Sequence, residues 1–99
     1  MSKNIAKTKN ADNLFEAILA LETVEECYSF FDDLCTIAEI GAIIQRFEVA
    51  NMLSERLTYS DIEKKTGAST ATISRINKCL LHGEGGYRTA IERMKAKKQ

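Results

Sequence analysis

Apolar side chains recur at intervals of three and four residues along most of the chain, and this periodicity predicts a series of amphipathic helices. The first helix is expected over residues 14–21, with Asp12 or Asn13 as its N-cap. A second helix is expected to follow and to end near Leu34. The pattern therefore favours an all-α fold.

The pattern Thr-x-x-Glu occurs twice, once at Thr23 and Glu26 and again at Thr36 and Glu39. In such a capping box the hydroxyl and the carboxylate each accept an N–H group that a helix start leaves without a partner. The second box opens a long helix over residues 37–56, whose apolar side chains spread beyond one face. A helix of this kind is usually deeply buried, and in so short a chain we expect burial against a second copy.

A short helix that begins near residue 58 is predicted to form the first half of a helix-turn-helix over residues 58–81. Either Thr58 with Asp61 or Ser60 with Glu63 can cap it. Its end is expected at Gly67, because glycine adopts a positive φ without steric cost.

The second helix of the motif follows at once, with Ser69 or Thr70 as its N-cap. One of its faces is apolar and is expected to pack inward; it carries Ile73, Ile76 and Leu80. Two helices joined by so tight a turn are typical of proteins that place the second helix in the major groove of DNA.

The segments outside these helices define the expected domain boundaries. Residues 1–11 are polar and are predicted to form a flexible arm. Residues 82–86 contain three glycines and are predicted to be a break before a last helix over residues 87–96. The helical domain is thus expected over residues 12–96, with a basic tail at 97–99.

Composition narrows the class of protein further. The chain has 99 residues, is 44% hydrophobic and contains no proline, which suits one small helical domain and not an all-β sandwich. No apolar run is long enough to span a bilayer, and the N-terminal sequence lacks the apolar core of a secretory signal. We expect a cytoplasmic protein without a membrane partner.

The residue types that carry most enzyme and metal chemistry are sparse. The three cysteines (Cys27, Cys35 and Cys79) form no C-x-x-C pair, and His82 is the one histidine. A zinc site or a disulfide framework is therefore not expected. A glycine-rich phosphate loop and a Ser-His-Asp set are also missing, so we expect neither an enzyme nor a cofactor.

Charge is distributed unevenly although the net charge is zero. Residues 1–58 carry a net charge of −5, and residues 59–99 carry +5. Such asymmetry indicates a polyanionic partner for the basic half.

The exposed face predicted for the second helix of the motif suits double-stranded DNA. Small and hydroxyl side chains at its start allow close approach to base edges, and cations nearby neutralise phosphates. The candidate DNA-binding residues are Lys64, Lys65, Ser69, Thr70, Ala71, Thr72, Ser74, Arg75 and Lys78.

These residues lie in two consecutive segments, LTYSDIEKK and TGASTATISRINKCL, which together resemble the helix-turn-helix of the Trp repressor superfamily. Over about residues 12–95 the chain is most similar to the Trp-repressor-related YerC/YecD family. The similarity also includes the segments LCTIAEIGAIIQRFEVANMLSERLTYSDI and GGYR. The resemblance implies a six-helix fold in which two chains interlock through their first three helices and the last one.

The same resemblance assigns roles within the motif. It places Thr70, Ala71 and Ser74 at base edges, and Ser69 and Thr72 near phosphates or the groove edge. At position 63 the Trp repressor has a lysine that faces DNA, whereas this chain has a glutamate. An operator different from the trp operator is therefore expected.

The tryptophan pocket implied by the family is altered. Arg75 matches one of its arginines, but Gln45 stands in place of the other, Ile76 in place of a glycine beside the indole, and Cys35 in place of a threonine. With Cys79, these residues are the candidate ligand pocket. Because Ile76 fills the space of the indole, we expect no tryptophan binding and leave a different small-molecule effector open.

The leading hypothesis is a homodimeric, sequence-specific DNA-binding protein that regulates transcription. An alternative is a dimeric helical interaction module that has lost DNA binding, which the acidic first half and Glu63 favour. A third hypothesis is a regulator controlled by a ligand in the altered pocket.

Overall fold

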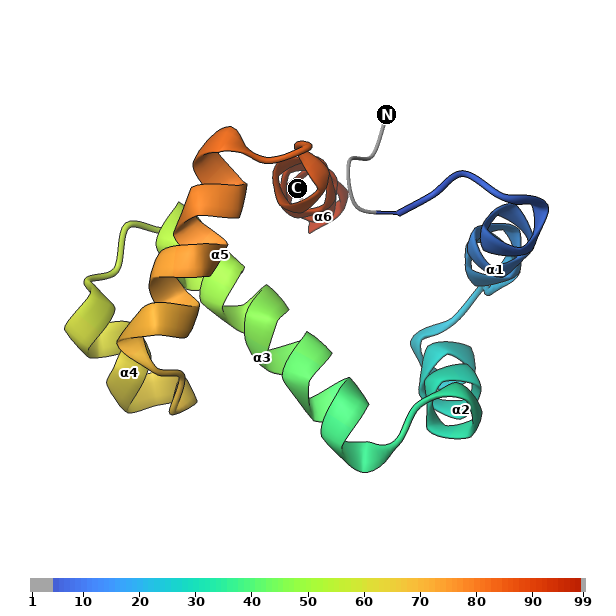
Figure 1. Ribbon diagram of the computed structural model, residues 1–99, viewed down its shortest axis with the longest axis horizontal. Helices are drawn as coiled ribbons and strands as arrows, with labels where there is room; N and C mark the ends of the chain where they lie inside the picture. The colour runs from blue at the N-terminus through green and yellow to red at the C-terminus, as the bar shows by residue number, and fades with distance from the viewer. Residues whose placement is uncertain (1–4, 99) are drawn as a thin grey trace. The chain divides into compact units, whose positions relative to one another are not determined.

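The computed structural model describes residues 5–98, and these form six α-helices without a β-strand (Figure 1). The helices are α1 (Lys9–Ala20), α2 (Val24–Leu34), α3 (Ile37–Ser54), α4 (Tyr59–Thr66), α5 (Thr70–His82) and α6 (Gly86–Lys98). The all-α prediction is confirmed. The chain divides into two compact units at Gly41, and α3 begins in the first unit and continues into the second. None of the helices in the described range is long and apolar enough to cross a membrane.

Helix α1 begins earlier than the sequence pattern predicts. Thr8 is its N-cap, and the Thr8 hydroxyl accepts a hydrogen bond from the Ala11 N–H at 3.0 Å. The predicted caps, Asp12 and Asn13, are therefore wrong. Asp12 instead forms an ion pair with Lys7 at 2.8 Å, so its carboxylate lies beside the positive end of the helix dipole.

Both predicted end segments are partly helical. The arm predicted at residues 1–11 is helical from Lys9 onward, and its residues 1–4 lie outside the described residues. Helix α6 continues to Lys98, so residues 97 and 98 of the predicted tail are helical, while residue 99 is not described. The lysines at this end suit a helix because they face the negative end of its dipole.

One of the two predicted capping boxes is complete, and the other is formed only on its hydroxyl side. Thr23 accepts from the Glu26 N–H at 3.1 Å, although the Glu26 carboxylate accepts from the Glu22 N–H and not from that of the cap. The box at Thr36 and Glu39 is reciprocal, with distances of 2.8 and 3.1 Å. The hydrogen bonds to Thr36 lower the pKa of the Glu39 carboxyl below its ordinary value. These bonds fix where α2 and α3 begin.

The buried core lies in the second unit. It combines one apolar side of each of the helices α3, α4, α5 and α6 with the turn between α4 and α5. In Figure 1, α5 crosses the C-terminal part of α3. The core residues are Val49, Ala50, Ile62, Ala68, Ile73, Ile76 and Ile91. Leu80, predicted to face inward, is only half-buried.

Helix α6 also meets α3 through an aromatic contact. The rings of Tyr87 and Phe47 lie 6.5 Å apart between centroids. Burial raises the pKa of the Tyr87 hydroxyl, a nearby Cys79 thiolate would raise it further, and Arg46 opposes both. The Tyr87 hydroxyl therefore stays protonated at neutral pH.

The first unit differs from the second because the residues described in α1 and α2 include no buried side chain. Large apolar side chains of α1, α2 and the start of α3 are exposed instead. They are Leu14, Phe15, Leu19, Val24, Tyr28, Leu34 and Ile37. Leu19 is 83% exposed and Ile37 is 89% exposed, far more than a folded chain normally leaves in water.

The Gly83→Ala variant should be less stable than the wild type by about 1 to 3 kcal/mol, the usual cost of overpacking. Gly83 is the C-cap of α5, and a Cβ atom there would collide with the Cys79 carbonyl oxygen. Urea unfolding followed by circular dichroism measures the loss. The control is Gly86→Ala, where a Cβ meets no atom within 4 Å and stability should change by less than about 0.5 kcal/mol. If Gly83→Ala and Gly86→Ala lower stability equally, the proposed collision at position 83 is wrong.

Candidate nucleic-acid interface

A three-residue turn joins α4 to α5 and sets the geometry of the helix-turn-helix. Thr58 is the N-cap of α4 and accepts from the Asp61 N–H at 3.1 Å, which selects it over the alternative cap, Ser60. At the other end Gly67 has φ +76° and donates to the Glu63 carbonyl at 2.9 Å. The predicted helix end at Gly67 is thus confirmed.

The turn itself is held by a threonine side chain. The Thr66 hydroxyl donates to the Ile62 carbonyl at 2.7 Å and accepts from the Ala68 N–H at 3.1 Å. Ala68 is 4% exposed, so its methyl group belongs to the core. These contacts leave the chain little freedom between the two helices.

Ser69 opens α5 as its N-cap. Its hydroxyl accepts from the Thr72 N–H at 3.2 Å and donates to the Thr72 hydroxyl at 3.0 Å. The bonds select Ser69 over Thr70 as the cap. The two hydroxyl groups are also hydrogen-bonded to each other. Ser69 and Thr72 therefore stabilise the start of α5 in the absence of any ligand.

Most of the predicted DNA-binding side chains lie on the surface of the motif. Lys64 and Lys65 are exposed in the last turn of α4, and Thr72 is half-buried. The exposed candidates at the start of α5 and along it are Ser69, Thr70, Ala71, Ser74, Arg75 and Lys78. Within the described part of the chain, Arg75 has no ion-pair or hydrogen-bond partner, so its guanidinium is available to a ligand.

Sequence reasoning missed the hydrogen bond between Thr70 and Glu63. The Thr70 hydroxyl donates to a carboxylate oxygen of Glu63 at 2.6 Å. The two residues are seven positions apart and lie on different helices, so no local sequence pattern predicts the contact. Its consequence is a carboxylate beside the start of α5, where the helix dipole favours negative charge.

Of the five candidate pocket residues, Gln45 and Ile76 make contacts within the second unit. The Gln45 amide donates to the Thr66 carbonyl at 3.1 Å, which gives the last turn of α4 a hydrogen-bond partner. Ile76 is 4% exposed and belongs to the core. Cys79 and Arg75 are exposed on α5, while Cys35 is the C-cap of α2 in the first unit.

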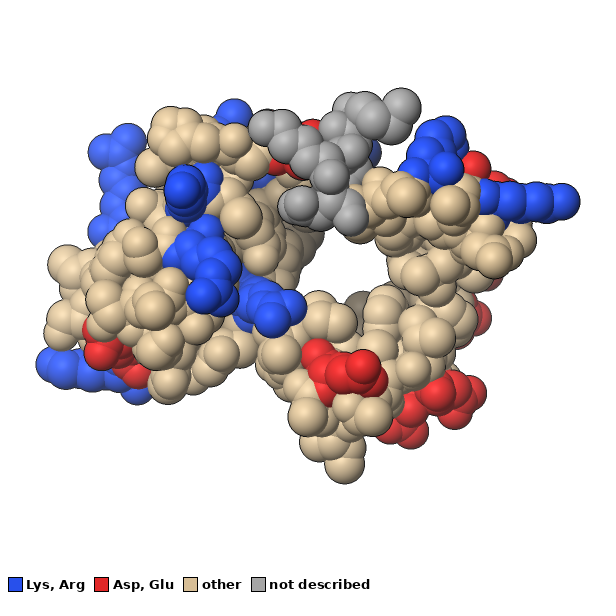
Figure 2. Space-filling model, viewed as in Figure 1, with Lys and Arg blue, Asp and Glu red and all other residues tan. Residues whose placement is uncertain are grey.

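Both units carry exposed charged side chains. Figure 2 shows Lys and Arg side chains over α5 and Asp and Glu side chains over α2. Among residues 5–98 no three His, Cys, Asp or Glu side chains are placed to hold a metal ion.

The fold and the exposed face of α5 define a helix-turn-helix protein of the small all-α class. A family model for Trp repressor proteins matches residues 9–95, and the chain belongs to this family. It is 58% identical over 87 residues to the Bacillus subtilis (strain 168) protein named "Uncharacterized protein YerC". That alignment covers 88% of this chain and 84% of the relative.

Two solved structures are similar over nearly the whole length. A TrpR like protein from Eubacterium eligens ATCC 27750 is 55% identical, with a TM-score of 0.86 over 90% of this chain and 92% of that one. A Staphylococcus aureus protein is 49% identical, also with a TM-score of 0.86, over 90% of this chain and 89% of that one. The resemblance to the Trp repressor superfamily is thus confirmed.

Ser69→Ala should lower the free energy of unfolding by about 1 kcal/mol, because it removes the hydroxyl that accepts from the Thr72 N–H. Thermal or urea unfolding measures the change. Ser74→Ala is the matched control, since Ser74 is exposed within α5 and alanine favours the helix. If Ser74→Ala is as destabilising as Ser69→Ala, the capping role is wrong.

Proposed function

We propose that this protein is a homodimeric helix-turn-helix regulator of transcription that binds double-stranded DNA at a specific sequence. The observation that carries the proposal is the exposed start of α5, where Thr70, Ala71 and Ser74 present small side chains. Side chains of this size let a helix end enter the major groove, and methyl groups of alanine or threonine suit contact with thymine. Family membership supports the same function.

The cations of the motif provide the contacts to phosphate. Lys64 and Lys65 lie at the end of α4, and Arg75 and Lys78 lie farther along α5. Contacts of this type position a protein on DNA and make its affinity fall steeply with salt. A flat salt response would favour the alternative, a helical interaction module that does not bind DNA.

The hydrogen bond between Thr70 and Glu63 restricts what this end of α5 can recognise. Because Thr70 donates its proton to Glu63, the Thr70 oxygen is left as an acceptor. The carboxylate of Glu63 is an acceptor as well. We therefore expect bases with a major-groove amino group, cytosine or adenine, opposite this end.

The exposed apolar surface of the first unit supports a dimer. Leu19 and Ile37 are more exposed than a stable monomer would leave them, and Tyr28 is 76% exposed. A second copy that covers these helices would bury them. It would also provide the second helix-turn-helix that a palindromic operator requires.

Tryptophan is not expected to be the corepressor. Gln45, which replaces an arginine of the family's pocket, is hydrogen-bonded to the Thr66 carbonyl. Ile76 occupies the core where the family has a glycine. A pocket filled in this way has no space for an indole ring.

The experiment that tests the proposal is selection of duplexes from a random pool at about 0.15 M salt, where loose charge attraction is largely screened. The expected result is enrichment of a palindrome whose half-sites lie about one helical turn apart. Without enrichment, the interaction module becomes the better hypothesis.

Ala71→Glu should lower affinity for the selected duplex at least about a hundredfold, because a carboxylate would face phosphates and base edges at close range. Fluorescence anisotropy measures affinity, and size-exclusion chromatography checks that the dimer remains. The matched control is Ala96→Glu, which adds the same charge at an exposed position of α6. Wild-type affinity of Ala71→Glu would contradict the docking of α5.

Glu63→Gln should raise affinity for duplexes of random sequence about three- to tenfold at low salt, because it removes a negative charge beside the proposed phosphate contacts. The amide oxygen can still accept from Thr70, so the local hydrogen bond is kept. Glu84→Gln, in the segment after α5, removes an equal charge outside the motif. An equal gain in both variants would indicate a general effect of net charge and not of this position.

A further inference from the structure

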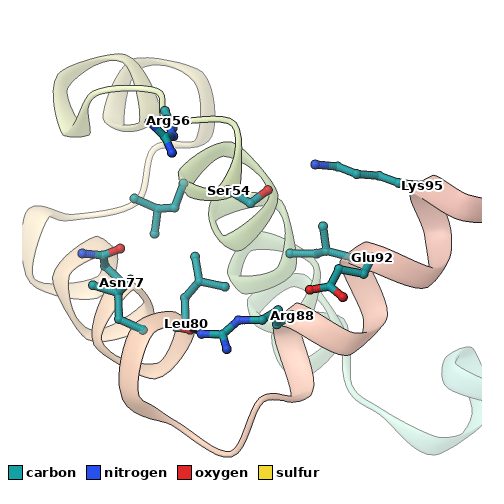
Figure 3. Close-up of a pocket in the computed structure, with 10 residues that line it drawn as sticks. Ser54, Arg56, Asn77, Leu80, Arg88, Glu92 and Lys95 are labelled. Atoms are coloured by element: carbon teal, nitrogen blue, oxygen red, sulfur yellow. Dashed lines mark hydrogen bonds between the residues drawn. The ribbon is translucent and has the colours of Figure 1, made fainter.

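A hollow of about 350 Å³ lies in the second unit, between the end of α3, the C-terminal half of α5 and one side of α6 (Figure 3). Four aliphatic side chains give it an apolar lining: Leu53, Leu80, Leu81 and Ile91. Ser54 and Asn77 add hydrogen-bonding groups at its edge. Its volume is at the lower end of the range for small-molecule sites.

Three cations from two different segments line the same hollow. Arg56 follows α3, and Arg88 and Lys95 belong to α6, whereas Glu92 is the one acidic residue of the lining. No ion pair involves these side chains in the part of the chain that the structure describes. In Figure 3 the Lys95 side chain extends from α6 in the direction of Ser54. The hollow thus has a net positive charge beside an apolar surface.

Arg56 has a backbone conformation that its side chain does not favour. Its φ is +65°, and among the described residues it is the one residue other than glycine with a positive φ. Arg56 lies just past the end of α3. Its backbone N–H donates to the Leu53 carbonyl at 3.0 Å, and the backbone N–H of Leu57 donates to the Met52 carbonyl at 3.1 Å. Glycine is the usual residue at such a helix end. An arginine there is disfavoured by the backbone, which points to a role for its side chain.

Arg88 is held in place before any ligand binds. Its Nη2 donates to the Leu80 carbonyl at 2.8 Å, which ties α6 to α5 at the border of the hollow. A planar guanidinium with one donor committed keeps other donors for an anion. Because its position is already fixed, less conformational entropy is lost on binding.

We propose that this hollow binds a small molecule with an oxyanion head, a phosphate monoester or a carboxylate, and a compact apolar body. The arginines suit bidentate contact with the oxyanion, and the aliphatic lining suits the body. None of the five residues of the altered family pocket (Cys35, Gln45, Arg75, Ile76 and Cys79) lines this hollow. It is therefore a separate site.

Calorimetric titration of the full chain without DNA tests the proposal, with phenyl phosphate as the probe. Benzyl alcohol has the ring without the charge, and inorganic phosphate has the charge without the ring. The wild type should bind phenyl phosphate at least about tenfold more tightly than either, since both parts of the site are then used. Absence of saturable binding, or equal affinity for inorganic phosphate, would overturn the proposal.

Three variants test whether phenyl phosphate binds in the hollow. Arg56→Gly should weaken binding of phenyl phosphate about tenfold while the chain stays folded, because glycine favours the conformation at this position. Glu92→Gln should strengthen it, since the one carboxylate of the lining is removed. Lys97→Gln is the matched control: it removes a cation of α6 that does not line the hollow, and affinity should not change. The same affinity in all four proteins would show non-specific binding and overturn the proposal.

A separate titration with a duplex of random sequence tests the competing occupant, a DNA phosphate. If Arg56→Gly weakens duplex binding and leaves the phenyl phosphate titration unchanged, the cations belong to a DNA-contacting surface and the proposal is wrong. The probe titration contains no DNA. If the protein does not bind DNA, the result of the phenyl phosphate titration is therefore unchanged. The two proposals can fail separately.

Discussion

The second unit depends on the packing of three fully buried aliphatic side chains: Val49 from α3, Ile62 from α4 and Ile73 from α5. They belong to one cluster, so the two helices of the motif are held both to each other and to α3. Burial of such side chains is worth about 1.5 to 3 kcal/mol each, more than any of the surface contacts nearby. The angle at which α5 is presented therefore follows from the core, and the hydrogen bonds of the turn only refine it.

Different faces of α5 contact the core, the solvent and the hollow. Ile73 and Ile76 face the core, Ala71 and Ser74 lie on the exposed side, and Asn77 lines the hollow. Because a helix has 3.6 residues per turn, neighbouring positions face in different directions and serve different contacts. A substitution in α5 is therefore interpretable only when unfolding is measured beside binding.

The sequence predicted most helix ends because they are local. A hydroxyl three residues before a helical N–H, as at Thr36 or Thr58, and a glycine at position 67 act within one turn of chain. The start of α1 was missed because Thr8 competes with Asp12 and Asn13, all acceptable caps. In the structure Thr8 is the cap, and Asp12 forms an ion pair with Lys7 instead.

The candidate site was predictable as a surface and not as a set of contacts. The exposed positions of α5 follow from the apolar face opposite them, so residues such as Ala71 and Ser74 could be assigned from the pattern alone. The contact between Thr70 and Glu63 and the one between Gln45 and Thr66 join residues on different helices. Their existence depends on how α4 packs, which no spacing rule encodes. The hollow near Arg56 was missed for the same reason.

The Gln45 and Ile76 side chains both contribute to the internal structure of the second unit. The Gln45 side chain is neutral, and its amide donates to the Thr66 carbonyl at the end of α4. Ile76 adds apolar area to the core at the position where a glycine would leave a gap. Both side chains thus serve packing or hydrogen bonding within the chain. The orientation of α5 in the structure therefore rests on contacts within the chain.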